Sequence, residues 1–337
     1  MVWKIFIYLC RNRTRWHPVE LLAGRILYNH MGNQMPRSIV EQINRLKCKG
    51  MHFDDENRAH DSLSHISYFR LKYYWKDMLD PETEEDFLST ASFEDVLKRY
   101  DFDRQLRVIL FSAIEIIEVA LRTKIINHLS QAANSGLWYL DRNLFERQDY
   151  FEDFVYDLKY EFNRCTEPFA KKYIEENPDW DYGSFDGPNP DAWMIFEGAT
   201  FGTLSKMYKN LKNQMPARSK IANDFGLYSA NEFSSWLEAI SVTRNIIAHH
   251  SRLWNRTLSK QTMNLKSHRD KWLNTPLTEG QKKKPYGIIT AMLYLCNAVC
   301  PQNNIREQLL HLLDNNQDVP YSRLGFSGTW RNEPIWK

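Results

Sequence analysis

The chain repeats apolar residues at helical spacing over most of its length. The clearest case comes after Asp103, where they recur every three or four positions: Leu106, Leu110, Ala113, Ile117, Leu121 and Ile125. That spacing puts all six on one face of a helix. We predict a short helix before Asp103, a long helix from about Asp103 onward, and a core that this face helps to form.

Shorter segments show the same period on both sides of this helix. They predict helices over residues 39–48, 55–78, 192–211, 231–250, 288–299 and 305–315. Gly50 ends the first of them, and Asn231 is suited to cap the start of the fourth. Gly198 and Gly202, one turn apart, would let another backbone approach closely. Together these segments predict an all-α fold.

Composition indicates how the chain is divided. Residues 1–35 look less organised than the rest of the chain, and Met31 and Met35 are alternative starting residues. Residues 183–191, GSFDGPNPD, combine Gly, Pro, Asp and Asn as loops do. We therefore expect an N-terminal extension over residues 1–35, one helical domain over 36–313 with a soft boundary near 183–191, and a C-terminal tail over 314–337.

The charges nearly cancel, because 44 Lys and Arg face 42 Asp and Glu, which leaves a net charge of +2. This balance excludes a uniform attraction to nucleic acid but leaves room for a local basic site. No apolar run is long enough for a transmembrane helix. The apolar VWKIFIYLC near the N-terminus is short, and its basic residues come after it, unlike those of a signal peptide. We expect a cytoplasmic protein with no membrane partner.

The cysteines give no sign of a disulfide framework or a zinc site. Their number is odd and their spacing scattered: Cys10, Cys48, Cys165, Cys296 and Cys300. Cys296 and Cys300 lie one turn apart on an apolar helix with no His nearby, so we expect core thiols there. We expect neither a metal nor another cofactor.

The segment SVTRNIIAHHSRLWNR, residues 241–256, stands out chemically. On a helical wheel the apolar arc contains Arg244 as well as six apolar residues: Phe233, Trp236, Leu237, Ile240, Ile247 and Ala248. A neighbouring polar stripe contains Glu238, Ser241, Asn245 and His249. Arg252 would join that stripe if the helix continued.

Two interpretations of this segment are open. His and Arg near a helix C-terminus complement the helix dipole, and Arg244 is suited to a structural ion pair. The density of Arg, Asn and His instead favours a binding or catalytic site, since a buried Arg needs an anionic partner and a phosphate is one.

The string RNIIAHHSRLWNR resembles the signature of the Abi-like (abortive infection) proteins, which belong to the HEPN superfamily. The R-x4–6-H motif of HEPN nucleases, with Asn after the Arg, falls here on Arg244, Asn245 and His249. Three further segments resemble the family's other blocks in the same order: residues 65–75, 100–125 and 192–208. The resemblance covers roughly residues 36–260.

The resemblance implies a HEPN-like helical bundle with additional N-terminal helices, and a metal-independent endoribonuclease. In that reaction the ribose 2′-OH attacks the adjacent phosphate and leaves a 2′,3′-cyclic phosphate. His249 would move the proton, Arg244 would hold the phosphate, and Asn245 would orient either group. Four residues would support catalysis or RNA binding: His250, Arg252, Asn255 and Arg256. Trp254 is suited to packing or to stacking on a base.

The reaction needs both an acid and a base, and the motif provides a single His. The family's usual solution is a homodimer that pools two motifs, and we expect one here. A second motif inside the chain is the alternative, with Arg122 and His128 at the required spacing. Arg122 also lies four residues after Glu118, which is the spacing of a simple ion pair.

Three functions remain open for the whole chain. The first is an antiphage ribonuclease toxin that cleaves host or phage RNA. The second is a non-catalytic RNA-binding protein that is associated with a small structured, regulatory RNA. The third is an all-α module in which these residues only tie helices together. RNA rather than DNA is the expected partner, and residues 65–75, HISYFRLKYYW, are suited either to packing or to RNA contact.

Overall fold

The computed structural model describes residues 36–337, and the expectations for residues 1–35 lie outside them. This part of the chain is all-α, as predicted, with isolated bridges and no sheet. Its helices are α2 (Ile39–Cys48), α3 (Glu56–His65), α4 (Tyr68–Trp75), α5 (Phe93–Ala133), α6 (Gln148–Asn163), α7 (Pro168–Glu176), α8 (Ala192–Ile195), α9 (Phe201–Asn210), α10 (Pro216–Asp224), α11 (Ala230–Ala248), α12 (Glu279–Lys282), α13 (Pro285–Val299) and α14 (Ile305–Asp314).

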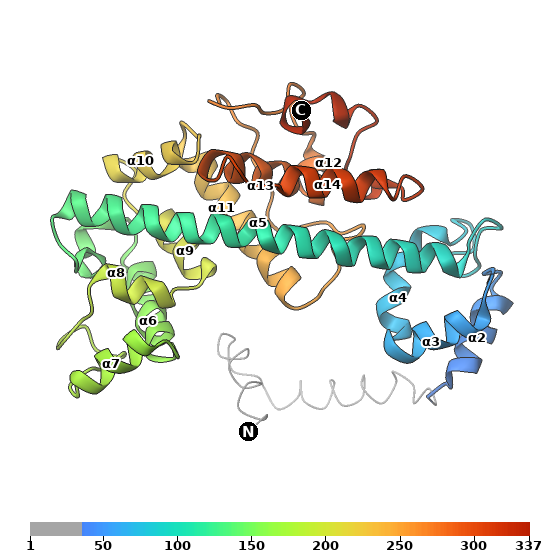
Figure 1. The fold of residues 1–337 in the computed structure, drawn as a ribbon, viewed down its shortest axis with the longest axis horizontal. Helices are drawn as coiled ribbons and strands as arrows, with labels where there is room; N and C mark the ends of the chain where they lie inside the picture. Colours follow the sequence, from blue (N-terminus) through green and yellow to red (C-terminus); the bar gives the residue numbers. More distant parts are fainter. Residues whose placement is uncertain (1–35) are drawn as a thin grey trace, which may run out of the picture.

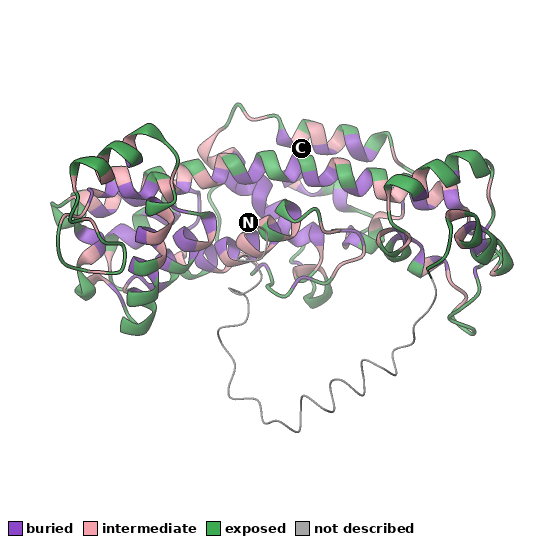
Figure 2. Ribbon diagram, turned by 90° about the horizontal axis from the view of Figure 1, so that it is seen from below, coloured by how far each residue is buried: buried purple, intermediate pink, exposed green. Residues whose placement is uncertain are grey.

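The long helix α5 organises the whole molecule. It crosses the full length of the fold, with α2–α4 below one end and α6–α9 below the other (Figure 1). α10, α11, α13 and α14 pack along it. Because α5 contacts helices along its whole length, from α4 to α8, buried residues extend from one end of the described fold to the other (Figure 2).

The prediction of where α5 begins is wrong, although its buried face is confirmed. The six apolar residues from Leu106 to Ile125 are all buried. The helix, however, is 41 residues long and begins at Phe93, so no separate short helix precedes it. Ser92 caps its first turn by accepting a hydrogen bond from the Asp95 amide, and the buried Phe93 and Val96 extend the apolar face backward.

Residues 55–78 also differ from prediction, because they form two helices rather than one. Ile66 is extended between α3 and α4, and Ser67 caps the new helix by accepting from the Arg70 amide. The aromatic residues of α4 then divide between two sides. Tyr74 and Trp75 are buried, whereas Phe69 and Tyr73 are exposed.

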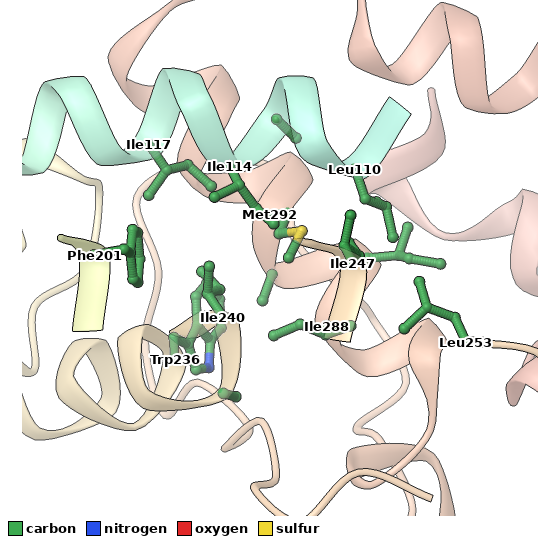
Figure 3. Close-up of a cluster of buried hydrophobic side chains, with 14 of the residues drawn as sticks. Leu110, Ile114, Ile117, Phe201, Trp236, Ile240, Ile247, Leu253, Ile288 and Met292 are labelled. Atoms are coloured by element: carbon green, nitrogen blue, oxygen red, sulfur yellow. The ribbon is translucent and has the colours of Figure 1, made fainter. Parts of the chain in front are cut away.

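The core around α11 fixes where its polar residues lie. Trp236, Ile240 and Ile247 of α11 pack with side chains of three other helices (Figure 3). These are Leu110, Ile114 and Ile117 of α5, Phe201 of α9, and Ile288 and Met292 of α13. The predicted cap is wrong, since Ser229 accepts from the Glu232 amide. Asn231 lies inside the helix and accepts from Arg218 at 3.0 Å.

The two glycines differ in what surrounds them. A Cβ on Gly198 would lie 3.3 Å from the Cα of Phe162 in α6, so the predicted close approach of backbones is confirmed. At Gly202 the nearest atoms are side-chain oxygens at 3.7 and 3.8 Å, so no backbone approaches and that prediction is wrong.

The last part of the chain packs onto α13. Tyr286 meets Phe326 at a ring-centre distance of 4.7 Å, and Trp330 and Trp336 join the same aromatic cluster. Cys296 is buried on α13, as expected for a core thiol, and burial raises the pKa of its thiol to about 12.

Candidate functional site

The C-terminal end of α11 stops at Ala248, with His249 as its cap residue. The amide of His250 donates to the Ile247 carbonyl at 2.8 Å and that of Ser251 to Ile246 at 2.9 Å. Both bonds define a Schellman motif, in which the residue after the cap is left-handed. His250 occupies that position with φ of +54°. The helix therefore ends before Arg252, and Arg252 does not join the polar stripe.

The polar stripe of α11 faces a groove of about 470 Å³, here called the Arg244 groove. Its walls come from α6, α9 and α11. The lining residues are Asp157, Tyr160, Glu161, Arg164, Thr200, Gly202, Thr203, Lys206, Ser241, Arg244 and Asn245. Two of the three motif residues thus share one groove, and His249 lies one helical turn after Asn245, about 6 Å further along.

Arg244 and Ala248 are not placed as the helical wheel predicted. Arg244 is half-buried at the groove rather than inside the core, and Ala248 is exposed. Ala248 is the last helical residue, and the chain turns away immediately after it. Thr243 takes the buried position on this side of α11 and donates to the Ala239 carbonyl at 2.9 Å.

Carboxylates from other helices surround Arg244. Burial raises the pKa of Glu118 on α5, while the charges of Arg122 and Arg244 act to lower it. Glu161 on α6 accepts from the Thr200 amide at 3.0 Å and from two threonine hydroxyls at 3.0 and 2.8 Å. Burial raises the pKa of Glu161, and these three bonds oppose the rise. The groove wall is thus a fixed polar surface.

The motif residues themselves are unpaired. The side chains of Arg244, Asn245 and His249 make no hydrogen bond or ion pair with any residue between 36 and 337. Residues that serve only to tie helices together normally have polar partners. Arg244 and Asn245, which line the groove, and His249, one turn further along, are instead available to a ligand.

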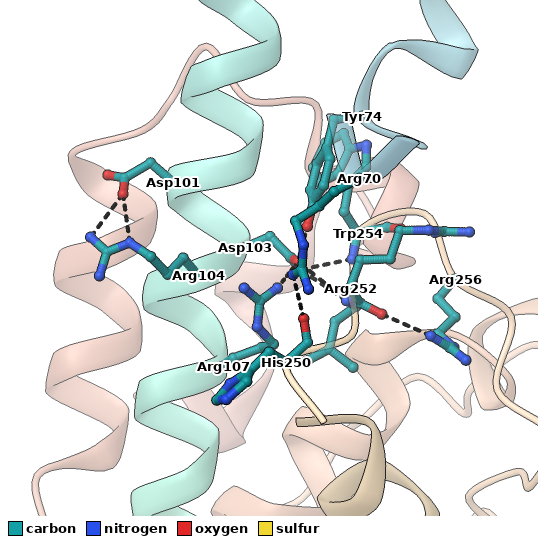
Figure 4. A network of polar contacts seen from close by, with 11 residues as sticks. Arg70, Tyr74, Asp101, Asp103, Arg104, Arg107, His250, Arg252, Trp254 and Arg256 are labelled. Carbon is teal, nitrogen blue, oxygen red and sulfur yellow. Dashed lines mark hydrogen bonds and ion pairs between the residues drawn. The ribbon is translucent and has the colours of Figure 1, made fainter. Parts of the chain in front are cut away.

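The segment after α11 is held by a buried carboxylate (Figure 4). Asp103 on α5 accepts from the amides of Leu253, at 3.1 Å, and Trp254, at 2.7 Å. It also accepts from the Tyr74 hydroxyl at 2.7 Å and pairs with Arg107. Burial raises the pKa of Asp103, and all these partners oppose the rise. The segment is therefore fixed to α4 and α5.

The four residues expected to support the site have structural contacts of their own. The carbonyl of His250 accepts from Arg70 at 2.7 Å, and the Asn255 side chain accepts from Lys284 at 3.2 Å. Arg252 donates to the Trp254 carbonyl, and Arg256 to the Arg252 carbonyl at 3.2 Å. Trp254 is fully buried, which confirms packing over base stacking.

The possible second motif is not brought together. Arg122 pairs with Glu118 at 3.2 Å, the simple ion pair that the spacing allowed, and donates to the Ala199 carbonyl at 3.0 Å. His128 contacts Asp224 on α10 at 2.9 Å. The two side chains meet different parts of the molecule, so they form no shared site.

Sequence reasoning missed the residues that α6 and α9 contribute to the groove. Glu161 and Arg164 belong to α6 and its cap, and Lys206 belongs to α9. A helical wheel of α11 gives no information on residues of other helices. Only Glu118 had a local signal, through its spacing from Arg122. The remaining wall depends on packing between helices far apart in the chain.

Two further features concern membranes and metals. None of the helices in the described part of the chain combines the length and apolar character that a membrane span requires. Residues 36–337 contain no group of three or more His, Cys, Asp or Glu placed to hold a metal ion.

These observations define a class: an all-α protein in which one helix, α11, presents unpaired Arg and Asn side chains to a groove and carries an unpaired His at its end. The model of the Abi-like protein family matches residues 61–255, more than half of the chain. The chain therefore belongs to this family and is a protein of the abortive-infection type. Comparison with curated proteins and with solved structures gave no match. The family match ends at Asn255 and so includes α5, the Arg244 groove and the segment that Asp103 holds.

Proposed function

We propose that this protein is an endoribonuclease of the HEPN type that acts in antiphage defence, in the cytoplasm, without a metal ion. The observation that carries the proposal is the set of unpaired motif side chains, with Arg244 and Asn245 lining the Arg244 groove and His249 one helical turn beyond Asn245. Residues that tie helices together do so through contacts within the protein, and these three side chains have no hydrogen bond or ion pair with a described residue. Arg, Asn and His are also the residues that phosphate chemistry at neutral pH requires.

Each motif residue would have its own part in the reaction. An imidazole takes the proton from the ribose 2′-OH, and the 2′ oxygen attacks phosphorus. The bond from phosphorus to the 5′ oxygen breaks, and that oxygen takes a proton from an acid. The products are a 2′,3′-cyclic phosphate and a 5′-OH. Arg244 stabilises the negative charge that builds on the phosphate, and Asn245 orients the phosphate or His249.

The acid and the base would come from two copies of the chain. Each copy brings one His249, exposed at the end of α11. A homodimer that faces the two helix ends toward each other gives one imidazole to the 2′-OH and the other to the leaving oxygen. Arg122 and His128 do not supply the second set, because they contact different helices.

The test is cleavage of a mixed RNA pool in EDTA by the wild-type protein and by His249→Ala, with His311→Ala as a matched exposed-histidine control. We expect the wild type and the control to produce cyclic-phosphate ends and the His249 variant to lose roughly 10²- to 10⁴-fold in rate. Equal cleavage by all three proteins, or none by the wild type, contradicts the proposal.

A second candidate is RNA binding without cleavage, with a structured small RNA as the partner. It is favoured by one observation: no described residue orients the His249 imidazole, whereas catalytic histidines usually have such a partner. Tight RNA binding by a folded wild-type protein that leaves RNA intact is the result that would select it.

A further inference from the structure

A second polar surface lies on the other side of the α11 terminus, next to α4. It begins with a groove of about 630 Å³ between α4 and the segment after α11. Its lining residues are Ser67, Phe69, Arg70, Tyr73, Tyr74, Ser251, Arg252, Arg256 and Thr257. A second groove, of about 870 Å³, shares Ser67 and Phe69 with the first. The two grooves therefore adjoin at the start of α4, and we call them together the α4 track.

The track is basic throughout. Its cations are Arg70, Arg252 and Arg256 in the first groove and Arg37, Arg45, His65 and Lys72 in the second. No Asp or Glu lines either groove. Three carboxylates lie close to the track without lining it. Glu41 lies near Arg37, Asp61 is 3.6 Å from His65, and the buried Asp103 accepts from the Tyr74 hydroxyl at 2.7 Å. None of the five arginines, nor Lys72, forms an ion pair with a described residue.

The track differs from the parts of the fold where Lys and Arg pair with carboxylates, as Lys124 does with Asp224 and Arg99 with Asp77. In the first groove the arginines instead donate to backbone carbonyls. Burial lowers the pKa of Arg252, and the neighbouring positive charge of Arg256 lowers it further. Asp103 and the two tyrosines of the groove oppose this lowering, but no carboxylate lines the groove itself. Like charges that face a groove without a carboxylate in its lining favour a bound anion.

Two aromatic rings stand among these cations. Phe69 is 76% exposed and Tyr73 is 50% exposed. The guanidinium of Arg252 lies over the Tyr73 ring at 4.7 Å, which holds both side chains in place. Exposed rings between phosphate-binding cations form the platform on which unpaired bases stack. A duplex hides its base faces, so this surface fits a single strand.

The track leads toward the motif. His249 comes two residues before Ser251, which lines the first groove, and one turn after Asn245, which lines the Arg244 groove. Arg70 also holds the His250 carbonyl at 2.7 Å. His249 thus lies within about 7 Å of residues of both surfaces, given the length of two residues of chain or one helical turn.

We propose that the α4 track binds single-stranded RNA, with its cations on the phosphates and with Phe69 and Tyr73 under unpaired bases, and guides the strand to His249. The proposal names the form of the substrate and rests on the ribonuclease function proposed above. It assigns the strand's binding and its cleavage to different residues, so the two can be tested separately.

The test measures binding of a fluorescent oligouridylate to the His249→Ala protein, which removes cleavage from the experiment. Adding Phe69→Ala with Tyr73→Ala should weaken binding at least about fivefold for each ring that stacks. Adding Arg45→Ala with Lys72→Ala should reduce the slope of log affinity against log salt by about 1.4, since each phosphate contact to a single strand contributes about 0.7. All four residues are exposed, so the fold should remain.

The matched control is Lys171→Ala with Lys220→Ala, which removes two exposed lysines far from α4. It should change neither affinity nor slope. The track is rejected if its variants bind like this control, if duplex RNA binds as tightly as the single strand, or if the His249→Ala protein binds no RNA. A wild type that binds through the track without cleaving would overturn the ribonuclease function and leave the track standing.

Discussion

The two surfaces on either side of the α11 terminus differ in charge and in how they are built. The Arg244 groove mixes Asp157 and Glu161 with Arg164, Lys206 and Arg244. The α4 track contains cations and exposed rings and no carboxylate. A mixed groove can place a proton or a charge at one atom, whereas a basic track with rings attracts any strand. On the proposed function, this difference assigns chemistry to the Arg244 groove and binding to the α4 track, with His249 between them.

Among residues that line the Arg244 groove, the largest effect should come from Arg244. Replacing Arg244 with Ala should lower the rate of cleavage at saturating RNA by roughly 10²- to 10³-fold, because the developing phosphate charge loses its cation. RNA affinity should change little, since the track remains. Single-turnover kinetics measure the rate, and anisotropy measures the affinity. A large loss of affinity with an unchanged rate would place Arg244 in binding and merge the two surfaces.

The buried carboxylate beneath the track gives the largest stability effect. Asp103→Ala should lower the free energy of unfolding by about 3–5 kcal/mol, since it leaves Arg107 buried and unpaired. Urea unfolding measures this loss. Asp101→Ala is the matched control, because Asp101 is half-exposed and its bond to Arg104 is a surface pair worth less than about 1 kcal/mol (Figure 4). Equal losses for both variants would contradict the role of Asp103.

Gly198 and Gly202 test how closely the neighbouring helices pack at each position. Gly198→Ala should cost about 1–3 kcal/mol, because its Cβ would lie 3.3 Å from the Phe162 backbone. Gly202→Ala should instead gain about 0.5 kcal/mol, since α9 has ordinary contact distances there and Ala favours a helix. Thermal unfolding compares the two. A gain of stability in Gly198→Ala would show that α6 is not closely packed against Gly198.

The smallest effect concerns the end of α11. His250→Gly should stabilise the fold by about 0.5 kcal/mol, because Gly adopts the left-handed conformation at φ of +54° without a steric cost. His250→Ala should not. Chemical unfolding of both variants measures the difference. A loss of stability in the Gly variant would mean that the imidazole contributes a contact beyond its backbone.

Local patterns predicted some parts of this molecule well. The buried face of α5 and the ion pair between Glu118 and Arg122 both result from helical spacing, and the structure confirms both. The end of α11 was predicted too late, since the left-handed position after its cap is occupied by His250 rather than by Gly, the usual stop signal. Ile66 likewise gave no sign that α3 and α4 are separate helices.

Long-range contacts account for the rest. The motif residues were found from the sequence, but their groove depends on α6 and α9, whose positions no local pattern gives. The hydrogen bond from the Leu253 amide to Asp103 joins residues 150 positions apart. Residues 65–75 were left open between packing and RNA contact. Their contacts show packing for Tyr74 and Trp75, and they leave Phe69 and Tyr73 at the surface.

The most direct test of this division is one experiment on two variants of the intact chain. Single-turnover cleavage and RNA affinity are measured side by side for His249→Ala and for Phe69→Ala with Tyr73→Ala, after circular dichroism has shown both to be folded. We predict that the first binds RNA like the wild type and does not cleave it. The second should bind weakly and recover the wild-type rate, with cyclic-phosphate ends, at saturating RNA. If the two variants lose binding and cleavage together, one surface performs both tasks and the account is wrong.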